Sequence, residues 1–396
     1  MRTNYLFNIS AAFFVATVTT TFAQSSWETV DNLAKSRGRD IVADSQGNFI
    51  SLAIDDSTNT SSPVTTAVSI SADHGATWQT VGSIAGYALD LAVAPDGAFF
   101  ATGNRSATVS GRAFLWQSLD HGATWTVIDP SAGLSSPMLV LDVAAGNSGA
   151  VYLCGYGGGG WIVRKGERTS TGIIWTTADN FPGNQADSIC VRPAAIPGQA
   201  DEILVCGRAS GLWTVRRSVN GGATWTTADS YSTGMQIGYA GVTTGPGDSI
   251  YVVGRIATTT TVTNRTVVHN KVVITTTTTT EYGWLVRKSA NGGASWANVD
   301  YVANGWPGNG NITADAFGRV FVVGGNNNPG AEGTSWLVRG SADGGSTWTT
   351  TDSFLPAGAT RASAQGVAID ALGNVCVVGE LYYGTTVSAP IRRLAP

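Results

Sequence analysis

Short apolar runs separated by tight turns recur along this chain, and no run after the N-terminal segment has apolar residues at helical spacing. In one stretch, an apolar run over residues 90–94 is followed by a Pro-Asp-Gly turn and a second run over residues 98–103. A third run often reads Trp-x-Val-Arg, as at Trp213–Arg216, and a fourth reads Trp-Thr-Thr-Ala-Asp, as at Trp225–Asp229. This order predicts a repeating unit of four antiparallel strands, so we expect an all-β protein.

An eight-residue phrase, Ser-x-Asp/Asn-x-Gly-x-Thr/Ser-Trp, lies between the third and fourth runs. Its Asp or Asn oxygen can accept backbone N–H groups of a turn, and its glycine supplies a positive φ. We therefore expect a structural role in hairpin turns for the acidic or amide residue of each near-complete copy: Asp73, Asp120, Asn220, Asn291 and Asp343. A degenerate copy ends at Trp175.

The phrase resembles the Asp box of sialidase-like (BNR-repeat) propellers, S-x-D-x-G-x-T-W, which joins the two outer strands of a blade in that family. The resemblance covers nearly all of the chain after its N-terminal segment. It implies a β-propeller of four-stranded antiparallel blades.

The spacing of the phrase predicts seven blades. Successive copies lie roughly 50 residues apart, except for one interval of roughly 70 that contains a Thr-rich insertion at residues 254–283 in the fifth blade. We expect that insertion to be an extended loop or a protruding hairpin. The last blade, residues 365–393, has only three candidate strands, and Trp27–Asp31 has the sequence of an outer strand without its turn. An N-terminal strand should therefore close the last blade and leave no free sheet edge.

Residues 1–23 have the pattern of a signal peptide: Arg2, an apolar stretch, and Thr21–Ala23 as a small-residue cleavage site. A membrane anchor is the alternative, but Asn8 and the Thr run interrupt the apolar segment. Residues 24–396 would then be one propeller that is secreted, or held in the periplasm or at the cell surface. We expect no later membrane span, and a monomer.

The charge pattern argues against nucleic acid as a partner. The formal net charge is −4, only 13% of residues are charged, and the arginines are dispersed rather than clustered. Nothing in the sequence calls for a cofactor.

Four cysteines are too few for a disulfide scaffold. Cys190 and Cys206 lie on consecutive predicted strands and could face each other, which would allow a disulfide in an exported protein. Free buried thiols are the alternative, because all four lie in apolar strand contexts.

Two sets of candidate site residues follow from aligning the blades. One set lies at the start of the innermost strand: Asp40, Asp90, Asp142, Ser188, Gly241, Asn311 and Gly366. The other lies just past the second strand: Asn104, Tyr156, Arg208, Arg255 and Glu380. Both sets should converge on the mouth of the central channel, on the face opposite the repeated turns.

These residue types allow three kinds of chemistry. Neighbouring carboxylates raise one another's pKa, as general-acid catalysis at sugars requires, which makes Asp40, Asp90, Asp142 and Glu380 candidate catalytic groups. They could instead bind a hard cation such as calcium, or each Asp could cap its own turn. The candidate ligand-binding residues are Tyr156, Arg208, Arg255, Trp306 and Asn311, which combine aromatic and polar groups suited to sugars.

The resemblance implies several functions, because that group includes sialidases, xyloglucan-active hydrolases, receptor ectodomains and photosystem assembly factors. A sialidase would need an arginine triad, a Tyr–Glu nucleophile pair and an acid/base Asp. The family's Phe/Tyr-Arg-Ile-Pro phrase is absent here, sialidases have six blades, and xyloglucan-active enzymes pair two propellers. We therefore expect a module that binds a glycan or a surface protein, with a sialidase-like or xyloglucanase-like glycoside hydrolase as the alternative.

Overall fold

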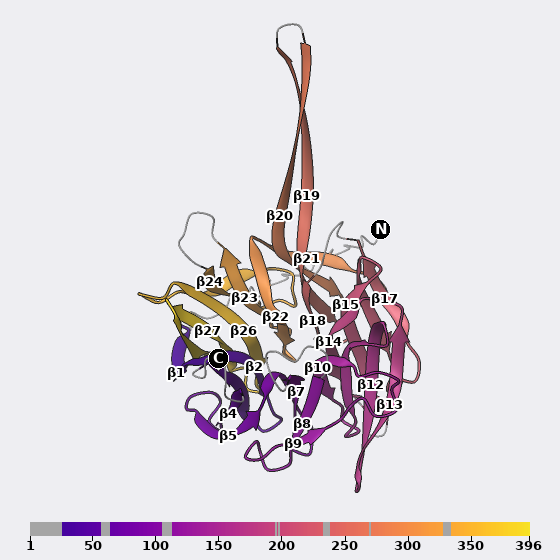
Figure 1. The fold of residues 1–396 in the computed structure, drawn as a ribbon. Coiled ribbons are helices and arrows are strands. Elements are labelled where there is room, and N and C mark those ends of the chain that lie inside the picture. The colour runs from indigo at the N-terminus through magenta and orange to yellow at the C-terminus, as the bar shows by residue number, and fades with distance from the viewer. Residues whose placement is uncertain are drawn as a thin grey trace, which may run out of the picture.

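Seven four-stranded antiparallel sheets form a ring, as the computed structural model shows (Figure 1). The structure describes residues 26–56, 64–104, 113–194, 196, 199–232, 238–268, 271–327 and 334–396. These residues form strands and no helix, so the predicted all-β, seven-bladed propeller is confirmed. Within them, no helix is long and apolar enough to cross a membrane.

Within each blade, the strands are given in order from the channel outward. Blade 1 is β2 (Ser36–Ala43), β3 (Phe49–Asp55), β4 (Thr65–Ser71) and β5 (Gln79–Ala85). Blade 2 is β6 (Tyr87–Val93), β7 (Phe99–Asn104), β8 (Ala113–Ser118) and β9 (Thr126–Ile128). Blade 3 is β10 (Leu139–Ala145), β11 (Val151–Gly157), β12 (Gly160–Thr169) and β13 (Gly172–Phe181). Blade 4 is β14 (Gln185–Arg192), β15 (Glu202–Ala209), β16 (Leu212–Ser218) and β17 (Thr226–Tyr231).

The remaining blades contain the long hairpin and the closure. Blade 5 is β18 (Gly238–Thr244), β19 (Ile250–Val268), β20 (Lys271–Ser289) and β21 (Ala297–Ala303). Blade 6 is β22 (Gly305–Ala314), β23 (Val320–Asn327), β24 (Thr334–Ser341) and β25 (Thr349–Phe354). Blade 7 is β26 (Arg361–Ile369), β27 (Val375–Tyr383), β28 (Thr386–Leu394) and, as its outer strand, β1 (Glu28–Ala34).

The ring closes where the N-terminal strand joins the C-terminal one. Strand β1 pairs antiparallel with β28, from Glu28 opposite Arg393 to Ala34 opposite Ser388. The Arg392 guanidinium strengthens this contact, donating to Thr29 Oγ1 at 3.1 Å and to the Trp27 carbonyl at 3.3 Å. The predicted closure by the segment around Trp27 is therefore confirmed.

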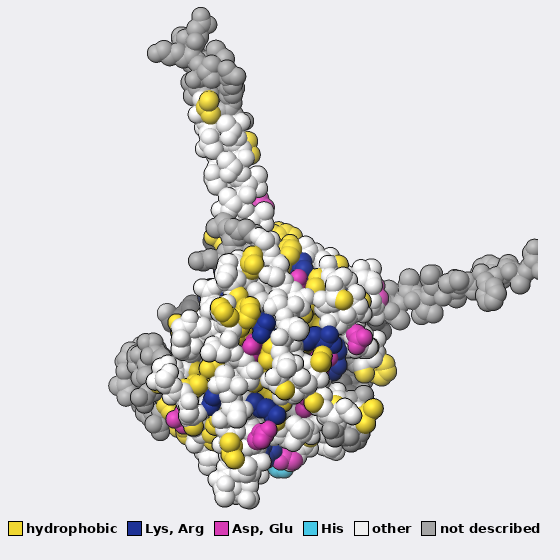
Figure 2. Space-filling view, turned by 90° about the vertical axis from the view of Figure 1, so that its right-hand side faces the viewer, with side chains coloured by type: hydrophobic (Ala, Val, Ile, Leu, Met, Phe, Trp, Pro, Cys, Tyr) yellow, Lys and Arg dark blue, Asp and Glu magenta, His cyan; other side chains and the backbone are white. Residues whose placement is uncertain are grey.

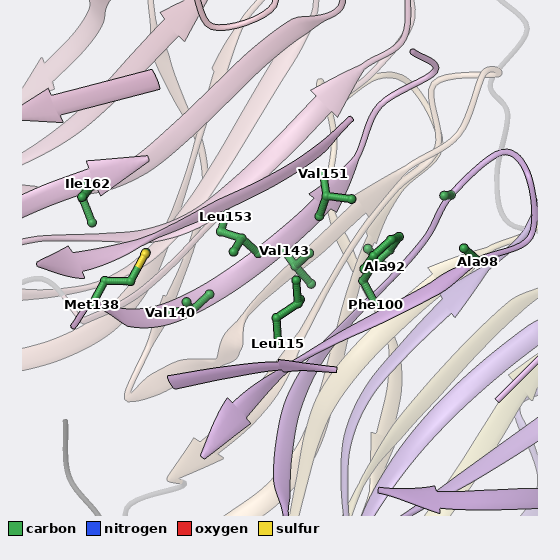
Figure 3. Packing of buried hydrophobic residues seen from close by; sticks show 11 residues of the cluster. Ala92, Ala98, Phe100, Leu115, Met138, Val140, Val143, Val151, Leu153 and Ile162 are labelled. Atoms are coloured by element: carbon green, nitrogen blue, oxygen red, sulfur yellow. The ribbon is translucent and has the colours of Figure 1, made fainter. Parts of the chain in front are cut away.

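The hydrophobic core is divided among the interfaces between blades. The buried residues described here form seven clusters, and each combines side chains from two neighbouring blades. Figure 3 shows the cluster between blades 2 and 3, where Phe100 and Leu115 meet Val143 and Leu153. The largest buried side chains are tryptophans of the third strands: Trp116, Trp161, Trp213, Trp284 and Trp336. A blade therefore has an apolar surface on both sides and covers neither by itself.

Arginines of the Trp-x-Val-Arg runs and aspartates of the outer strands form ion pairs between blades. Arg216 donates from Nε and Nη2 to the two carboxylate oxygens of Asp179, both at 2.9 Å. The same pairing joins each later blade to the one before it: Arg287 to Asp229, Arg339 to Asp300 and Arg392 to Asp352. In blade 3 the corresponding Arg164 donates to the carbonyls of Pro130 and Ala132 instead.

The repeated phrase forms the turn between third and fourth strands. In the first copy, Ser71 Oγ donates to Asp73 Oδ1 at 2.7 Å and accepts the Gly75 N–H at 2.8 Å. Thr77 donates its N–H and its hydroxyl to Asp73, and the Trp78 indole donates to the Gly75 carbonyl. Corresponding bonds are formed around Asp120, Asn220, Asn291 and Asp343, so these residues hold turns.

The Thr-rich insertion is a protruding hairpin. Strands β19 and β20 stay paired without a register shift from Ile250 opposite Ser289 to Val268 opposite Lys271. The part beyond the sheet, residues 257–268 and 271–282, is called the arm, and Figure 1 shows it rising from one face of the ring. That face, at which the second strands end, is called the upper face, and the repeated turns lie on the lower face.

The possible disulfide between Cys190 and Cys206 is not formed, and all four cysteines are free thiols. Cys190 lies opposite Leu204, whereas Cys206 lies opposite Ser188, so the two thiols are offset along the hairpin instead of facing each other. Burial raises the pKa of Cys190 to about 11.

We predict that deleting residues 24–33 destabilises the whole ring. The deletion removes most of β1, leaves the edge of β28 unpaired, and exposes the apolar side chains that Trp27 covers in blade 7. Thermal unfolding should shift to clearly lower temperature, and size-exclusion chromatography should show aggregates. Deletion of residues 24–26 alone, which keeps β1, is the control and should change neither. An unchanged melting temperature in the longer deletion would contradict the role given to β1.

Candidate functional site

A cavity of about 670 Å³ lies on the axis of the ring and is lined by the first strands of all seven blades. The charged residues that line it are Arg39, Asp40, Asp90, Asp142, Asp187 and Arg208. The predicted aspartates, Asn311 and Arg208 therefore do converge on the channel. Glu380, Tyr156, Arg255 and Trp306 are not part of its wall.

The aspartates sit in the middle of their strands, not at the start as the sequence predicted. Each first strand shifts register at this point, as between Gly38 and Asp40 in β2 and between Ala88 and Asp90 in β6. One residue is skipped in the first strands of blades 1, 2, 3, 4 and 7, which is typical of a β-bulge, and the shift spans more residues in β18 and β22. The bulge lets the following side chain reach sideways to the next blade.

These side chains form a belt of hydrogen bonds around the channel. Asp40 Oδ2 accepts the Leu91 N–H of blade 2 at 3.0 Å, and Asp90 Oδ2 accepts the Val143 N–H of blade 3 at 2.9 Å. The same contact to the following blade is formed by the other members: Asp142 to Ile189, Ser188 to Val242, and Asn311 to Val367. We call Asp40, Asp90, Asp142, Ser188 and Asn311 the inner belt.

The inner belt also explains why a predicted position carries no side chain in blade 7. A Cβ atom on Gly366 would lie 2.9 Å from the Asp40 Cα and from the Ile41 nitrogen, so a side chain does not fit there. Asn311 of blade 6 reaches past this glycine, and its Nδ2 donates to Asp40 Oδ1 at 3.1 Å. An amide thus takes the place of a carboxylate in this part of the belt.

Burial favours the neutral form of the belt carboxyls. It raises the pKa of Asp40 to about 7 and raises the pKa of Asp142. The pKa of Asp90 is raised well above its usual value by burial and by the nearby charges of Asp142 and Asp40. Asp90 and Asp142 lie close enough for each to shift the pKa of the other.

Two clusters of charged side chains lie above the inner belt, toward the upper face, one in blade 4 and one between blades 1 and 7. In blade 4, Asp187 is hydrogen-bonded to Gln185 and lies near Arg208, and burial raises the pKa of Asp187 to about 6. Between blades 1 and 7, Arg39 Nη1 lies 3.0 Å from Glu380 Oε1, and the Tyr382 hydroxyl donates to Glu380 Oε2 at 2.8 Å. Burial, followed by the charge of Glu380, raises the pKa of Tyr382 to about 12.

Several of these polar atoms are buried without a hydrogen-bond partner in the described part of the chain. They are Arg39 Nε, Arg208 Nε and Asp187 Oδ2 in the cavity wall, and Asn104 Oδ1, Arg255 Nε and Asn326 Oδ1 at the ends of second strands. Buried polar groups are normally paired.

The other predicted ligand residues lie around the cavity rather than in it. Tyr156, at the upper end of β11, is 43% exposed. The Arg255 guanidinium stacks on the Tyr282 ring at 4.7 Å from its centroid at the base of the arm. Trp306 is half-buried because its ring packs against Gly325, which leaves only part of it free for contact.

Sequence reasoning missed Arg39 and Gln185, and it placed Tyr382 in a loop of this face, whereas Tyr382 lies on strand β27. Arg39 and Asp187 occupy the skipped positions of their bulges, and a bulge is not visible in one strand's sequence because its partner decides the register. Tyr382 stands two residues after Glu380 on β27, so the strand period placed it on the same face. That spacing was the one available signal.

A calcium site does not follow from the carboxylates. Among the described residues, no three His, Cys, Asp or Glu side chains gather in an arrangement that could hold a metal ion. The belt oxygens already accept N–H groups, and protonation lowers the negative charge that a hard cation needs.

Solved structures similar to this chain share its fold at low sequence identity. No protein-family model matches the chain, and no curated protein matches it. A xyloglucanase from Xanthomonas campestris is 11% identical over 91% of this chain, with a TM-score of 0.51, and the chain spans 54% of that protein. A polysaccharide lyase, an ulvan lyase solved with a -[GlcA(1-4)Rha3S]- saccharide bound, is 9% identical over 91% of this chain and 95% of its own, with a TM-score of 0.52.

A sialidase from Streptococcus pneumoniae is 14% identical over 91% of this chain and 68% of its own, with a TM-score of 0.43. The xyloglucanase and the ulvan lyase are named as enzymes that act on glycans, and at 9–11% identity their likeness to this chain establishes the fold alone.

We predict that Asp90→Asn stabilises the protein above neutral pH. A carboxyl whose folded pKa is raised contributes stability that is fully present below about pH 4 and is lost as the pH rises through the folded pKa. Asn keeps an acceptor for the Val143 N–H and cannot ionise, as Asn311 already demonstrates in blade 6. The melting temperature should rise by about 2–4 °C at pH 8 and stay within about 1 °C at pH 4.5.

Asp90→Ala is the contrasting variant. It leaves the Val143 N–H without an acceptor, so we expect it to lower the free energy of unfolding by roughly 1–3 kcal/mol at both pH values. Equal effects of Asn and Ala would show that Asp90 does not hold the neighbouring blade.

Proposed function

We propose that this chain is an exported propeller of the Asp-box type that binds a glycan at the upper mouth of its channel. The observation that supports this most directly is the cavity of about 670 Å³ whose wall carries the charged side chains of Arg39, Asp187 and Arg208. Its volume lies within the roughly 300–1,000 Å³ of small-molecule sites. A surface protein is the other partner predicted from the sequence, and a concave polar cavity suits a sugar better.

The chemistry of the wall fits a polyhydroxyl ligand. Arg39 and Arg208 offer N–H donors, Asp187 offers an acceptor, and the neutral belt carboxyls can do both. A sugar hydroxyl likewise donates and accepts hydrogen bonds. Sugar hydroxyls can therefore pair with both the donors and the acceptors of the wall, and the ligand needs no charge of its own. Tyr156, exposed one strand outward from the wall, adds a face on which a sugar ring can stack.

The binding proposal predicts that Arg208→Ala weakens retention on glycans. Purified residues 24–396 should bind members of a glycan array, and calorimetry on the best ligand should show a loss of roughly 10–100-fold in Arg208→Ala, the range expected when a hydrogen bond to a charged group is removed. Arg168→Ala is the matched control, since Arg168 pairs with Asp96 on the lower face. No retention of any glycan, or equal losses in both variants, would refute the proposal.

A glycoside hydrolase is the second candidate, but with a different site from the one predicted. Asp90 and Asp142 are engaged with backbone N–H groups of the next blade, whereas a glycosidase needs two carboxyls that are free to act on the substrate. The hydrogen-bonded Tyr382 and Glu380 are the groups that favour this candidate, because the sialidase resemblance implies a Tyr–Glu nucleophile pair. Burial raises the pKa of Tyr382, and the positive charges of Arg37 and Arg361 act in the opposite direction. The Arg361 guanidinium lies over the Tyr382 ring, 5.1 Å from its centroid.

An assay of substrate turnover distinguishes a glycan-binding protein from a glycoside hydrolase. We expect no release of product from chromogenic sialosides or plant glucans by the wild-type protein. Release that persists in Tyr383→Phe but is lost in Tyr382→Phe would establish the hydrolase instead, since Tyr383 is the exposed neighbour on the same strand.

A further inference from the structure

A second concave site, of about 390 Å³, lies on the outer rim of the ring between blades 4 and 5, and we call it the rim groove. One wall is formed by residues 227–230 of the outer strand β17, and the other by residues 293–296 of the repeated turn in blade 5. Arg287, which is 6% exposed, lies at its base. The rim groove shares no lining residue with the channel cavity, and its volume lies within the roughly 300–1,000 Å³ of small-molecule sites.

The positive charge at the base of the rim groove is balanced by the protein. Arg287 donates from Nε to Asp229 Oδ2 at 3.0 Å, and its Nη2 lies 2.9 Å from the same oxygen. Its Nη1 donates to Asn298 Oδ1 at 2.7 Å, and the guanidinium lies over the Tyr231 ring, 3.9 Å from the centroid. Arg287 and Asp229 are the charged residues of the lining, so the rim groove carries no net charge.

Asp229 meets its arginine differently from the other aspartates of the outer strands. Arg216, Arg339 and Arg392 each reach both carboxylate oxygens of their aspartate, whereas the contacts of Arg287 described above are both to Oδ2. The Asp229 carboxylate also accepts the backbone N–H of the following residue. A carboxylate has about four acceptor sites, so a ligand hydroxyl in the groove can also donate to Asp229.

Trp296 is fixed in the wall by both blades. Its indole N–H donates to the Gly293 carbonyl of its own turn at 3.2 Å, and also to the Ala228 carbonyl of blade 4 at 2.9 Å. The Arg287 guanidinium lies 6.0 Å from the centroid of the indole ring. A ring that is already held in place loses little side-chain entropy when a sugar stacks on it.

The backbone of the turn is engaged within the turn itself. The Gly293 N–H donates to Ser289 Oγ at 2.8 Å, and the Ser295 N–H donates to Asn291 Oδ1 at 2.9 Å. The Ala294 N–H donates to the Asn291 carbonyl at 3.3 Å. Because these N–H groups are bonded and the ion pair is neutral, the rim groove is poorly suited to an anion.

Hydroxyl groups make up the rest of the polar lining. Thr227, Ser230 and Ser295 are exposed along the rim groove. The Thr227 and Ser295 hydroxyls accept hydrogen bonds from Arg216 Nη1 and Asn291 Nδ2, so each can still donate to a ligand. Figure 2 shows the side of the ring on which β17 lies, where the surface is mostly white and positive and negative side chains lie next to one another. A neutral ligand rich in hydroxyl groups fits this combination.

We propose that the rim groove is a second carbohydrate site, which takes a neutral sugar residue between the Trp296 ring and the Asp229 carboxylate. The site is distinct from the channel and does not depend on a ligand binding there. If both sites are occupied by one polysaccharide, each raises the effective concentration of the chain at the other.

The indole N–H of Trp296 gives a local readout of this site. Residues 24–396 labelled with ¹⁵N at the tryptophan indoles should be titrated with the neutral methyl glycosides of glucose, galactose, mannose and xylose. At least one glycoside should shift the Trp296 signal, which Trp296→Phe identifies, with a Kd of about 1–10 mM. Glycerol should not shift it, and the glycoside should not shift the signal of Trp125, which has the same position in the turn of blade 2.

A substitution that fills the rim groove tests its location. Ala294→Tyr places a ring among the lining residues and should raise the Kd about tenfold or more. Ala123→Tyr is the matched control, because Ala123 has the same position in the turn of blade 2, where Trp116 takes the place of Arg287. Both alanines are exposed, so both variants should keep the wild-type melting temperature.

Three results would overturn the proposal. They are a Trp296 signal that no glycoside of the panel shifts at 50 mM or so, an equal shift with glycerol, and wild-type affinity in Ala294→Tyr. Because the readout lies at the rim, a channel that binds no glycan leaves it unchanged, so the two proposed sites can fail separately.

Discussion

Every blade of this protein is a four-stranded sheet with apolar side chains on both faces, and that condition governs the rest of the structure. Each of the seven described core clusters draws on two adjacent blades, so a blade is buried only when it has a neighbour on both sides. An open row of blades would always leave two faces exposed, and a closed ring leaves none. Closure depends on β1 joining β28, which makes the first and last strands of the fold parts of one sheet.

Polar contacts join neighbouring blades at two distances from the axis of the ring. Near the outside, buried Arg–Asp pairs such as Arg216–Asp179 join consecutive blades, with the guanidinium stacked on an aromatic ring such as Phe181, 4.2 Å away. At the axis, the inner belt joins each first strand to the next through a side chain and a backbone N–H. Blades 1 and 2 lack the arginine and contribute Asp40 and Asp90 to the belt, whereas blades 4 and 6 contribute to both sets of contacts.

The same belt separates structural from functional candidates. Its carboxyls are satisfied by neighbouring backbone and are neutralised by burial, so they resemble parts of a wall more than reactive groups. Above them, the side chains of Arg39, Asp187 and Arg208 line the cavity that a ligand can enter. The arm rises from this same upper face.

Local chemistry in the sequence was sufficient for the repeat, the turns and the blade count, because each Ser-x-Asp-x-Gly-x-Thr-Trp copy closes its own bonds within eight residues. The lone strand at Trp27 then determined how the ring ends. Contacts between blades depended on tertiary structure: the Trp-x-Val-Arg and Thr-Thr-Ala-Asp motifs were both visible, but their pairing across a blade interface was not. The mid-strand position of Asp40, the skipped Arg39 and the offset of Cys190 from Cys206 all follow from strand register, which is set by the neighbouring strand and is not encoded in either strand alone.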